Sequence, residues 1–308
     1  MSKETVVKFR TTFRRALPHE KGIEFRGIRY VVGEPDKFSD SPKTVERLAD
    51  FSGLFALKVK EMVNSPDIRY VFTTMPLETC VKEARGQGKN IQTLKDSVKE
   101  ALGKETEVFV EPQGILGLEA LIQQRKLVKA PTLLIDGGFN TVNLLLVRED
   151  LTAPVMVSYY NRGVSRLIEI FGAILQNKGV ASNLSISQLQ ETFLEGSLDM
   201  GTEEVPVEEE KKASLDFYVE ELLSEILDLI RARGERFKQV AVVGGISYYL
   251  KSLPDYFKGK RVYVPEEGGE YLNLLGLVRK AEKKGQVENS LIFDLGFGFV
   301  KYYRGEEQ

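Results

Sequence analysis

The sequence has 308 residues, with 43 lysines and arginines against 45 aspartates and glutamates, one histidine, one cysteine and no tryptophan. A chain of this length builds one large domain or two lobes, and its 42% apolar and 29% charged residues exclude a disordered or fibrous protein. Single cysteine and histidine residues exclude a disulfide framework and the usual zinc sites. The net charge of −2 gives no electrostatic basis for direct nucleic-acid binding.

Neither a membrane span nor a secretory signal is visible in the sequence. No apolar run approaches the roughly 20 residues that a spanning helix needs. The N-terminal segment lacks the apolar core of a signal peptide. We therefore expect a cytoplasmic protein that has no membrane partner.

In the first half of the chain, apolar and polar residues alternate over residues 5–15, which predicts one strand. Two short runs of strand formers, at 23–25 and 28–32, flank Arg26-Gly27, and this pattern is typical of a hairpin. Residues 44–63 carry apolar side chains at helical spacing and predict one helix. The rest of this half predicts strands at 69–73 and 107–110 and helices at 91–102 and 115–124.

The second half also alternates strands and helices, which indicates the α/β class. A polar stretch over residues 177–212 interrupts the pattern, and its Glu-rich run at 203–210 predicts solvated surface. A long helix over 213–233 carries a core-facing apolar stripe. Three more helices are expected: one that begins after residue 163, one that ends at residue 253 and one over 271–282. The remaining expected strands are at 132–138, 141–149, 155–160, 239–243, 261–265, 290–296 and 299–305.

The most informative feature is a self-match, in which residues 133–143 align without gaps on residues 291–301. Asp136 aligns with Asp294, and the second glycine position, a phenylalanine and a valine are also identical. Three apolar residues precede the aspartate in both copies. Each copy therefore predicts a buried strand, an aspartate at its end, a glycine-containing turn and a second strand.

Such a turn has specific chemistry. Glycine allows backbone N–H groups to approach phosphate oxygens without a Cβ in the way. An aspartate at the strand end can hold the hydrated Mg²⁺ that accompanies those phosphates. Two such hairpins that face each other would bind one nucleotide from both sides.

These residues resemble the phosphate-binding hairpins of the actin, heat-shock chaperone and sugar-kinase ATPase superfamily. Asp294, with Lys301 seven residues later, resembles the first hairpin of the actin branch, and Asp136-Gly137-Gly138 resembles the second. Gly244-Gly245, after an apolar run, resembles the turn that lies against the adenosine. The overall resemblance is best to bacterial actin-like proteins of the ParM type, which segregate plasmids.

The resemblance implies a two-lobed actin-like α/β fold made of duplicated ribonuclease-H-like domains. Lobe I would comprise residues 1–128 and 270–308, with a small subdomain at about 23–66. Lobe II would comprise residues 129–269, with an insertion at about 178–212.

The order of the hairpins departs from the family pattern. The family has the hairpin of the Asp294 type at the N-terminus, and here it is at the C-terminus. If the two ends of the chain were joined, residues 299–308 would lead through a turn into residues 1–13 as the next strand. This order predicts a circular permutation whose cut lies in a surface hairpin, with the polar residues 283–289 bridging the old ends.

The resemblance also implies ATP or ADP with Mg²⁺ as ligands and assigns roles to residues. Asp294 and Asp136 would hold Mg²⁺ through water, and Lys301 would reach the β- and γ-phosphates. Glu111, expected at a helix start, would orient the hydrolytic water, with Gln113 as a competing candidate and Asp136 as a second catalytic residue. The remaining nucleotide-binding candidates are Gly137, Gly138, Phe139, Asn140, Gly244, Gly245, Ile246, Gly296, Phe297 and Gly298.

Each candidate also has a purely structural interpretation. The aspartates could cap turns, Lys301 could be an edge-strand surface residue, and Glu111 could complement a helix dipole. The glycines could simply form tight turns. His19 and Cys80 receive no functional role.

Three functions are compatible with this chemistry. The first is an actin-like ATPase that polymerises into filaments for DNA or plasmid segregation, with self-association and a possible DNA-bound adaptor as its contacts. The second is a nucleotide-binding scaffold that does not polymerise. The third is a small-molecule kinase, which would need a carboxylate base that the sequence does not clearly supply.

Overall fold

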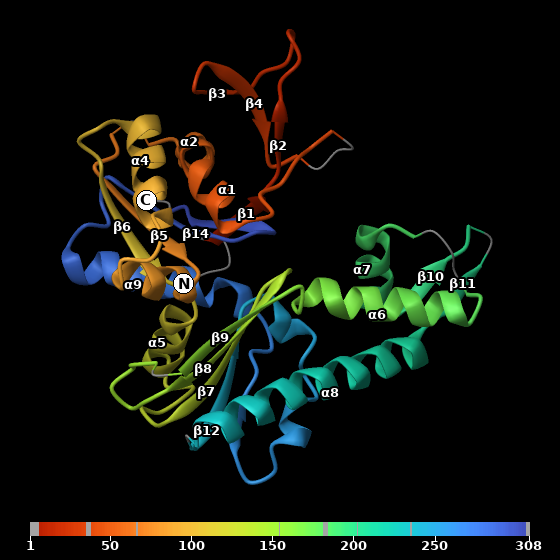
Figure 1. Ribbon diagram of the computed structural model, residues 1–308. Coiled ribbons are helices and arrows are strands. Elements are labelled where there is room, and N and C mark those ends of the chain that lie inside the picture. Colours follow the sequence, from red (N-terminus) through yellow and green to blue (C-terminus); the bar gives the residue numbers. More distant parts are fainter. Residues whose placement is uncertain are drawn as a thin grey trace. The chain divides into compact units, whose positions relative to one another are not determined.

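The structure is a computed structural model (Figure 1) that describes residues 6–34, 38–65, 67–153, 155–180, 184–201, 203–234 and 236–305. The chain divides into two compact units. Unit 1 contains Met1–Val128 and Glu270–Gln308, and unit 2 contains Lys129–Gly269. Each unit contains one five-stranded sheet.

The sheet of unit 1 has the strand order β1-β15-β14-β5-β6. The neighbours β1, β15 and β14 are antiparallel, whereas β14, β5 and β6 run parallel. The central strand β14 packs against side chains on both of its faces, which accounts for its continuous apolar run. The strands are β1 (Val6–Arg10), β5 (Tyr70–Met75), β6 (Glu107–Pro112), β14 (Ser290–Leu295) and β15 (Phe299–Tyr303).

The sheet of unit 2 has the order β13-β12-β7-β8-β9. Here β7, β8 and β9 are antiparallel neighbours, and β7, β12 and β13 run parallel. The central strand β7 is buried along its whole length. The strands are β7 (Thr132–Gly137), β8 (Thr141–Val147), β9 (Val155–Tyr160), β12 (Gln239–Val243) and β13 (Arg261–Tyr263).

The two sheets share one arrangement. In unit 2, β7 is central, with β8 and β9 on one side and β12 and β13 on the other. Unit 1 has the same arrangement once β14 and β15 are counted before β1, because β14 is then central, with β15 and β1 on one side and β5 and β6 on the other. The hairpin β14–β15 of unit 1 therefore corresponds to the hairpin β7–β8 of unit 2.

Helices pack on both faces of the sheet of unit 1. Side chains alternate along a strand, so Phe293 packs in one cluster with Leu54 and Leu94, and Ile292 packs in another with Leu116 and Leu274. The first cluster involves α2 and α4, and the second involves α5 and α9. The helices of this unit are α1 (Val45–Asp50), α2 (Ser52–Val63), α3 (Leu77–Ala84), α4 (Asn90–Leu102), α5 (Ile115–Gln123) and α9 (Leu272–Lys284).

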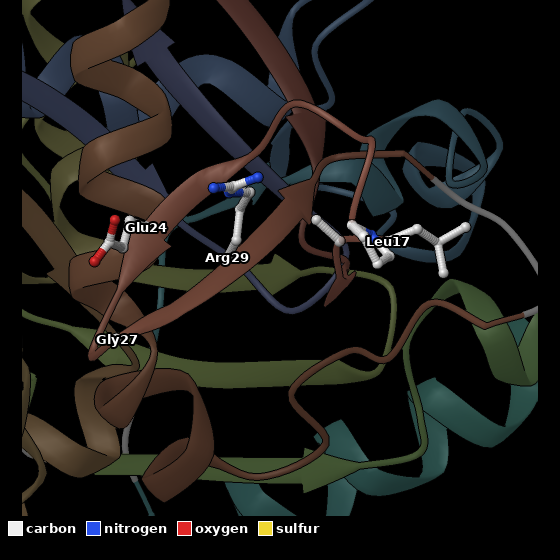
Figure 2. A pocket seen from close by; sticks show the side chains of 6 residues that line it. Leu17, Glu24, Gly27 and Arg29 are labelled. Carbon is white, nitrogen blue, oxygen red and sulfur yellow. The ribbon is translucent and has the colours of Figure 1, made fainter.

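Unit 1 also carries a small sheet of order β2-β4-β3, formed by β2 (Phe13–Arg15), β3 (Ile23–Phe25) and β4 (Ile28–Val32). The hairpin β3–β4 is confirmed, and Arg26 and Gly27 in its turn have φ values of 52° and 72°. A cavity of about 320 Å³ opens on this sheet. Figure 2 shows Leu17, Glu24, Gly27 and Arg29 around it, all from the hairpin or the segment after β2.

In unit 2, α6 (Val164–Asn177) and α8 (Glu208–Arg233) run side by side and pack with residues of one face of the sheet (Figure 1). No helix in the described ranges is both long enough and apolar enough to cross a membrane. The remaining elements are α7 (Ile186–Glu195), β10 (Ser197–Asp199), β11 (Glu204–Pro206) and the short 3-10 helices η2 (Gly245–Tyr248), η3 (Leu253–Tyr256) and η4 (Gly269–Tyr271).

Two elements expected in the first half are each divided. The single strand over 5–15 is wrong, because Thr11 and Thr12 leave the ladder and the chain passes from β1 in the large sheet to β2 in the small one. The single helix over 44–63 is also wrong. The hydroxyl of Ser52 donates to the carbonyl of Ala49 at 2.7 Å, and α1 ends where α2 begins.

Several expectations for other segments also need correction. The polar stretch 177–212 contains α7, β10, β11 and the start of α8. The Glu-rich run is largely exposed, as predicted, at Glu203, Glu204, Glu208 and Glu209, but Glu210 is 8% exposed and accepts from Lys178 at 2.6 Å. After Gly244 the chain forms 3-10 turns rather than an α-helix, and α9 extends to Lys284, so the connection to β14 is shorter than the expected 283–289. Helix α3 was not expected from the sequence.

Candidate functional site

The two matching sequence segments form matching hairpins. In β7–β8, Asp136 lies opposite Asn143, and in β14–β15, Asp294 lies opposite Lys301. The same turn bond closes both hairpins, from Gly138 N to Thr141 O at 2.9 Å and from Gly296 N to Phe299 O at 3.2 Å. The repeated strand, aspartate, turn and strand predicted from the sequence are therefore confirmed in both copies.

The carbonyl groups of the turn in unit 2 are all bonded. The N–H groups of Val164, Ser165 and Arg162 donate to the carbonyls of residues 138, 139 and 140 at 3.1, 2.8 and 3.2 Å. The start of α6 approaches the turn so closely that a Cβ on Gly163 would lie 2.5 Å from two of these oxygens. Glycine at position 163 is therefore required by the close approach.

Among the described residues, Thr11 alone donates hydrogen bonds to the carbonyl groups of the turn in unit 1. Thr11 donates its N–H to the carbonyl of Gly298 at 3.1 Å and its hydroxyl to the carbonyl of Gly296 at 2.6 Å. Thr11 is fully buried at the end of β1. Gly296 and Gly298 align with Gly138 and Asn140, so two corresponding carbonyls are bonded in both turns.

The N–H groups at the tips of these turns remain available. Within the described part of the chain, the N–H groups of Phe139, Asn140, Phe297 and Gly298 have no hydrogen-bond acceptor. Unbonded N–H groups are costly when buried away from water, and successive ones in a turn form a concavity that binds anions. Each turn can therefore bind an anionic ligand such as a phosphate group.

Asp294 is buried at 1% exposure and has three side-chain donors. Thr74 donates to its Oδ1 at 2.6 Å, Gln113 donates to the same oxygen at 3.1 Å, and Lys301 lies 2.8 Å from its Oδ2. Gln113 also donates to the carbonyl of Leu295 at 3.0 Å. These contacts fix the carboxylate at the end of β14 beside the turn.

Asp136 occupies the corresponding position in unit 2 at 6% exposure. The amide of Asn143 donates to its Oδ2 at 3.3 Å, and Ser158 donates to the Oδ1 of Asn143 at 2.7 Å. Because Ser158 bonds the amide oxygen, the amide nitrogen is directed to the carboxylate.

The predicted glycine turn after β12 lies against this aspartate. A Cβ on Gly244, whose φ is +84°, would lie 3.2 Å from the Oδ1 of Asp136 and would clash with the carbonyl of Gly137. A Cβ on Gly137 would lie 2.5 Å from the side chain of Ile246, whereas a Cβ on Gly245 would meet nothing within 4 Å. The candidate residues of unit 2 are therefore brought together, with open space at Gly245.

Lys301 and Glu111 differ in position from the expectations. Lys301 is on β15, which has neighbours on both sides, so the edge-strand interpretation is wrong. Glu111 lies within β6 rather than at a helix start, since α5 begins at Ile115, and its carboxylate pairs with Lys280 at 2.7 Å. Gln113, not Glu111, contacts Asp294.

Sequence reasoning missed four residues of these clusters, namely Thr11, Thr74, Asn143 and Ser158. Asn143 could have been found, because it aligns with Lys301 in the repeat. Thr11 and Thr74 contact the hairpin from segments far away in the sequence and carry no local signal.

The carboxylates suit a hydrated magnesium ion. Oxygen ligands and retained water are typical of Mg²⁺ sites in proteins. A direct bond to Oδ2 of Asp294 would displace Lys301, whereas a contact through water would not. Among the described residues, no group of three or more acidic, histidine or cysteine side chains could hold a metal.

No protein-family model and no curated protein sequence matches the chain. Solved structures do match. An archaeal actin homolog matches with a TM-score of 0.70 and 18% identity, covering 90% of this chain and 92% of that one. A ParM filament protein from Clostridium botulinum matches with a TM-score of 0.63 and 14% identity over 89% and 92% of the two chains.

A third match is MreB 5 of Spiroplasma citri bound to AMPPNP, with a TM-score of 0.58 and 14% identity over 91% of this chain and 90% of that one. These similarities extend over about 90% of the chain. The chain therefore has the fold of the actin-like superfamily, as the resemblance of its two hairpins implies.

Proposed function

We propose that this protein binds Mg-ATP, hydrolyses it and assembles into filaments. The observation that carries the proposal is the pair of matching turns, each with two adjacent unbonded N–H groups beside a buried aspartate at a strand end. Backbone N–H groups directed at phosphate oxygens are a recurrent way to bind nucleotides. Among the structural neighbours, the archaeal homolog was solved with ADP and MreB 5 with AMPPNP.

In the proposed mechanism, both turns donate backbone N–H groups to phosphate oxygens. Mg²⁺, held through water by Asp136 and Asp294, would neutralise phosphate charge when bound. Lys301 adds a positive charge on β15, two residues from the turn. Because these donors are fixed before the ligand arrives, they stabilise charge on the phosphates without reorganisation.

The position of Gln113 supports a role in orienting the hydrolytic water. Its amide nitrogen is directed to Asp294, Thr74 and the carbonyl of Leu295, so its Oε1 can accept a hydrogen bond from water. The carboxylate of Glu111 already pairs with Lys280. We therefore assign the orienting role to Gln113, and Glu111 remains the alternative.

Two neighbours support the proposed assembly, since a ParM from Clostridium botulinum and Alp12 were solved as filaments. That similarity supports the proposed self-association of this chain. A DNA-bound adaptor and DNA or plasmid segregation belong to the same proposal, as does a location in the bacterial cytoplasm.

We also propose that the chain is circularly permuted relative to the family. Its support is the shared sheet arrangement, which requires β14 and β15 to be counted before β1. The antiparallel pairing of Val6 with Tyr303 places the last described strand beside the first, as a hairpin would.

Sedimentation with ATP, phosphate release and negative-stain imaging of the pellet test the proposed function together. Filaments that form with ATP and disappear with ADP would support it. Nucleotide binding without hydrolysis or polymer would indicate a scaffold. ATP turnover without polymer would direct attention to a kinase, tested with small hydroxyl-containing substrates.

Two variants test the assignment of the water-orienting residue. Gln113→Ala should lower the hydrolysis rate about a hundredfold, because positioning and proton-transfer groups contribute about this much. Glu111→Gln should lower it less, since the partner of Glu111 is Lys280. A larger loss of hydrolysis rate in Glu111→Gln than in Gln113→Ala would instead indicate that Glu111 orients the water.

A further inference from the structure

Among the described residues that bond the carbonyls of the two turns, Thr11 alone uses its side chain. In unit 2, backbone N–H groups supply the bonds to the turn carbonyls. In unit 1, the Thr11 hydroxyl donates to the carbonyl of Gly296, the position where unit 2 uses the N–H of Val164 on the Gly138 carbonyl. A hydroxyl therefore replaces a backbone donor at equivalent points of the repeat.

The direction of a turn carbonyl also determines the direction of the next N–H group, because the peptide unit is planar. The carbonyl of Gly296 belongs to the same peptide as the N–H of Phe297. When Thr11 holds that carbonyl on its own side, the N–H of Phe297 is directed away from Thr11. The Thr11 N–H acts on the carbonyl of Gly298 at 3.1 Å, so one residue fixes both ends of the turn.

We propose that Thr11 is a positioning residue for phosphate binding, whose hydroxyl holds the Gly296–Phe297 peptide with the N–H of Phe297 directed to the ligand. This inference rests on the proposed nucleotide binding. The hydroxyl acts through the turn and does not itself contact the phosphate. Its loss therefore affects ligands in proportion to the phosphate groups that they carry.

The neighbouring residue provides a matched control. Thr12 has a buried hydroxyl for which no hydrogen-bond partner occurs within the described residues. Thr11→Val and Thr12→Val remove the same group from adjacent positions with little change in volume. Only the first removes a hydroxyl that donates to the carbonyl of Gly296, and the loss of such a hydrogen bond carries a free-energy cost.

The test measures dissociation constants for ATP and adenosine by displacement of a fluorescent ATP analogue from the full chain. We expect Thr11→Val to weaken ATP binding about tenfold and to leave adenosine binding unchanged, because adenosine has no phosphate. Thr11→Ser, which keeps the hydroxyl, should restore ATP binding to within about threefold of the wild type. Thr12→Val should bind both ligands like the wild type. If Thr11→Val does not fold, Thr11→Ala provides the same comparison.

Two results would overturn the inference while the proposed function stands. One is a Thr11→Val variant that binds ATP as tightly as the wild type. The other is an equal loss of ATP and adenosine affinity, which would indicate a general structural defect. A wild-type protein that binds neither ligand would instead overturn the proposed function, and the inference with it.

Discussion

Asp294 and Asp136 have different opposite residues in hairpins that otherwise match. Lys301 places a positive charge 2.8 Å from Asp294, whereas Asn143 offers Asp136 a neutral amide at 3.3 Å. The ion pair of unit 1 is largely buried, with side-chain exposures of 16% and 1%. Breaking such a pair leaves an uncompensated charge in a poorly solvated place.

The Lys301→Met variant should therefore destabilise unit 1. We expect a loss of about 3 kcal/mol in the free energy of unfolding, at the low end for a buried pair because Thr74 and Gln113 still donate to Asp294. Urea unfolding of the ligand-free protein measures this change. The double variant Asp294→Asn, Lys301→Met removes both charges and should lose less than the single variant, and equal or larger losses in the double variant would contradict the ion-pair account.

Cys80 allows a prediction about pH. Burial, and secondarily the charges of Glu111 and Glu83, raise the pKa of its thiol to about 12. Because the thiolate is the reactive form, alkylation of the native protein at pH 8 should be about a thousandfold slower than in urea and should rise tenfold per pH unit up to about pH 12. Since the chain has one cysteine, thiol titration reports on Cys80 alone. Rapid native reaction at pH 8 would contradict the prediction.

The site was predicted from sequence only where the chemistry is local. The repeat identified Asp136 and Asp294, and the resemblance to the actin branch identified Lys301, because each hairpin is formed by about ten consecutive residues. Thr74 lies 220 residues from its partner Asp294 in the sequence, and no local sequence pattern predicts such a contact. Glu111 was favoured over Gln113 by resemblance, and only tertiary contacts separate the two residues, because Glu111 pairs with Lys280 whereas Gln113 donates to Asp294.

At the scale of elements, the contact between α5 and α9 depends on a glycine. A Cβ on Gly276 would lie 2.6 Å from the carbonyl oxygen of Leu116 and 2.7 Å from its Cβ. Both atoms are held by α5, so the helices would have to separate. The glycine, which ordinarily weakens a helix, is needed here for the close approach.

Gly276→Ala should therefore destabilise the protein by about 1–3 kcal/mol, as overpacking does, although alanine is the better helix former. Gly172→Ala in α6 is the matched control. A Cβ there would lie 2.8 Å from the end of the Leu189 side chain, which can rotate away. We expect little change, or a gain of up to about 1 kcal/mol, in the control. Thermal or urea unfolding of both variants provides the comparison, and similar values for the two would contradict the close-packing argument.

The boundaries of helices and strands were predictable where the hydrophobic period of the element and the turn residues at its ends agree. The hairpin at Arg26-Gly27 and the strands β7 and β14 were found because glycine turns and apolar runs mark them. The alternation over residues 5–15 continues across two different sheets, and only the tertiary bonds of Thr11 reveal the break. Helix α7 begins with a capping box at Ser185 and Gln188, and this pair is a sequence signal for a helix start within the polar stretch.

At the scale of the whole molecule, the order of strands along the chain can be changed and tested. Moving residues 290–308 to the N-terminus and joining Gln308 to Met1 would connect β15 to β1 through the five residues after Tyr303 and the five before Val6. We expect a folded protein that keeps nucleotide binding, since exposed turns tolerate such cuts. Circular dichroism and ATP binding measure the outcome. Failure to fold with both this direct joint and a longer glycine-serine linker would count against the permutation.

The position of β14 has a consequence for the order in which the protein can fold during synthesis. Unit 2 needs only one continuous segment, 129–269, and can fold as soon as that segment has left the ribosome. The central strand of the other large sheet, β14, is made after β1, β5 and β6, so these strands must wait for it. Long-range pairing of this kind folds slowly and leaves strand edges exposed in the meantime. The half of the protein that is begun first is therefore the half that is completed last.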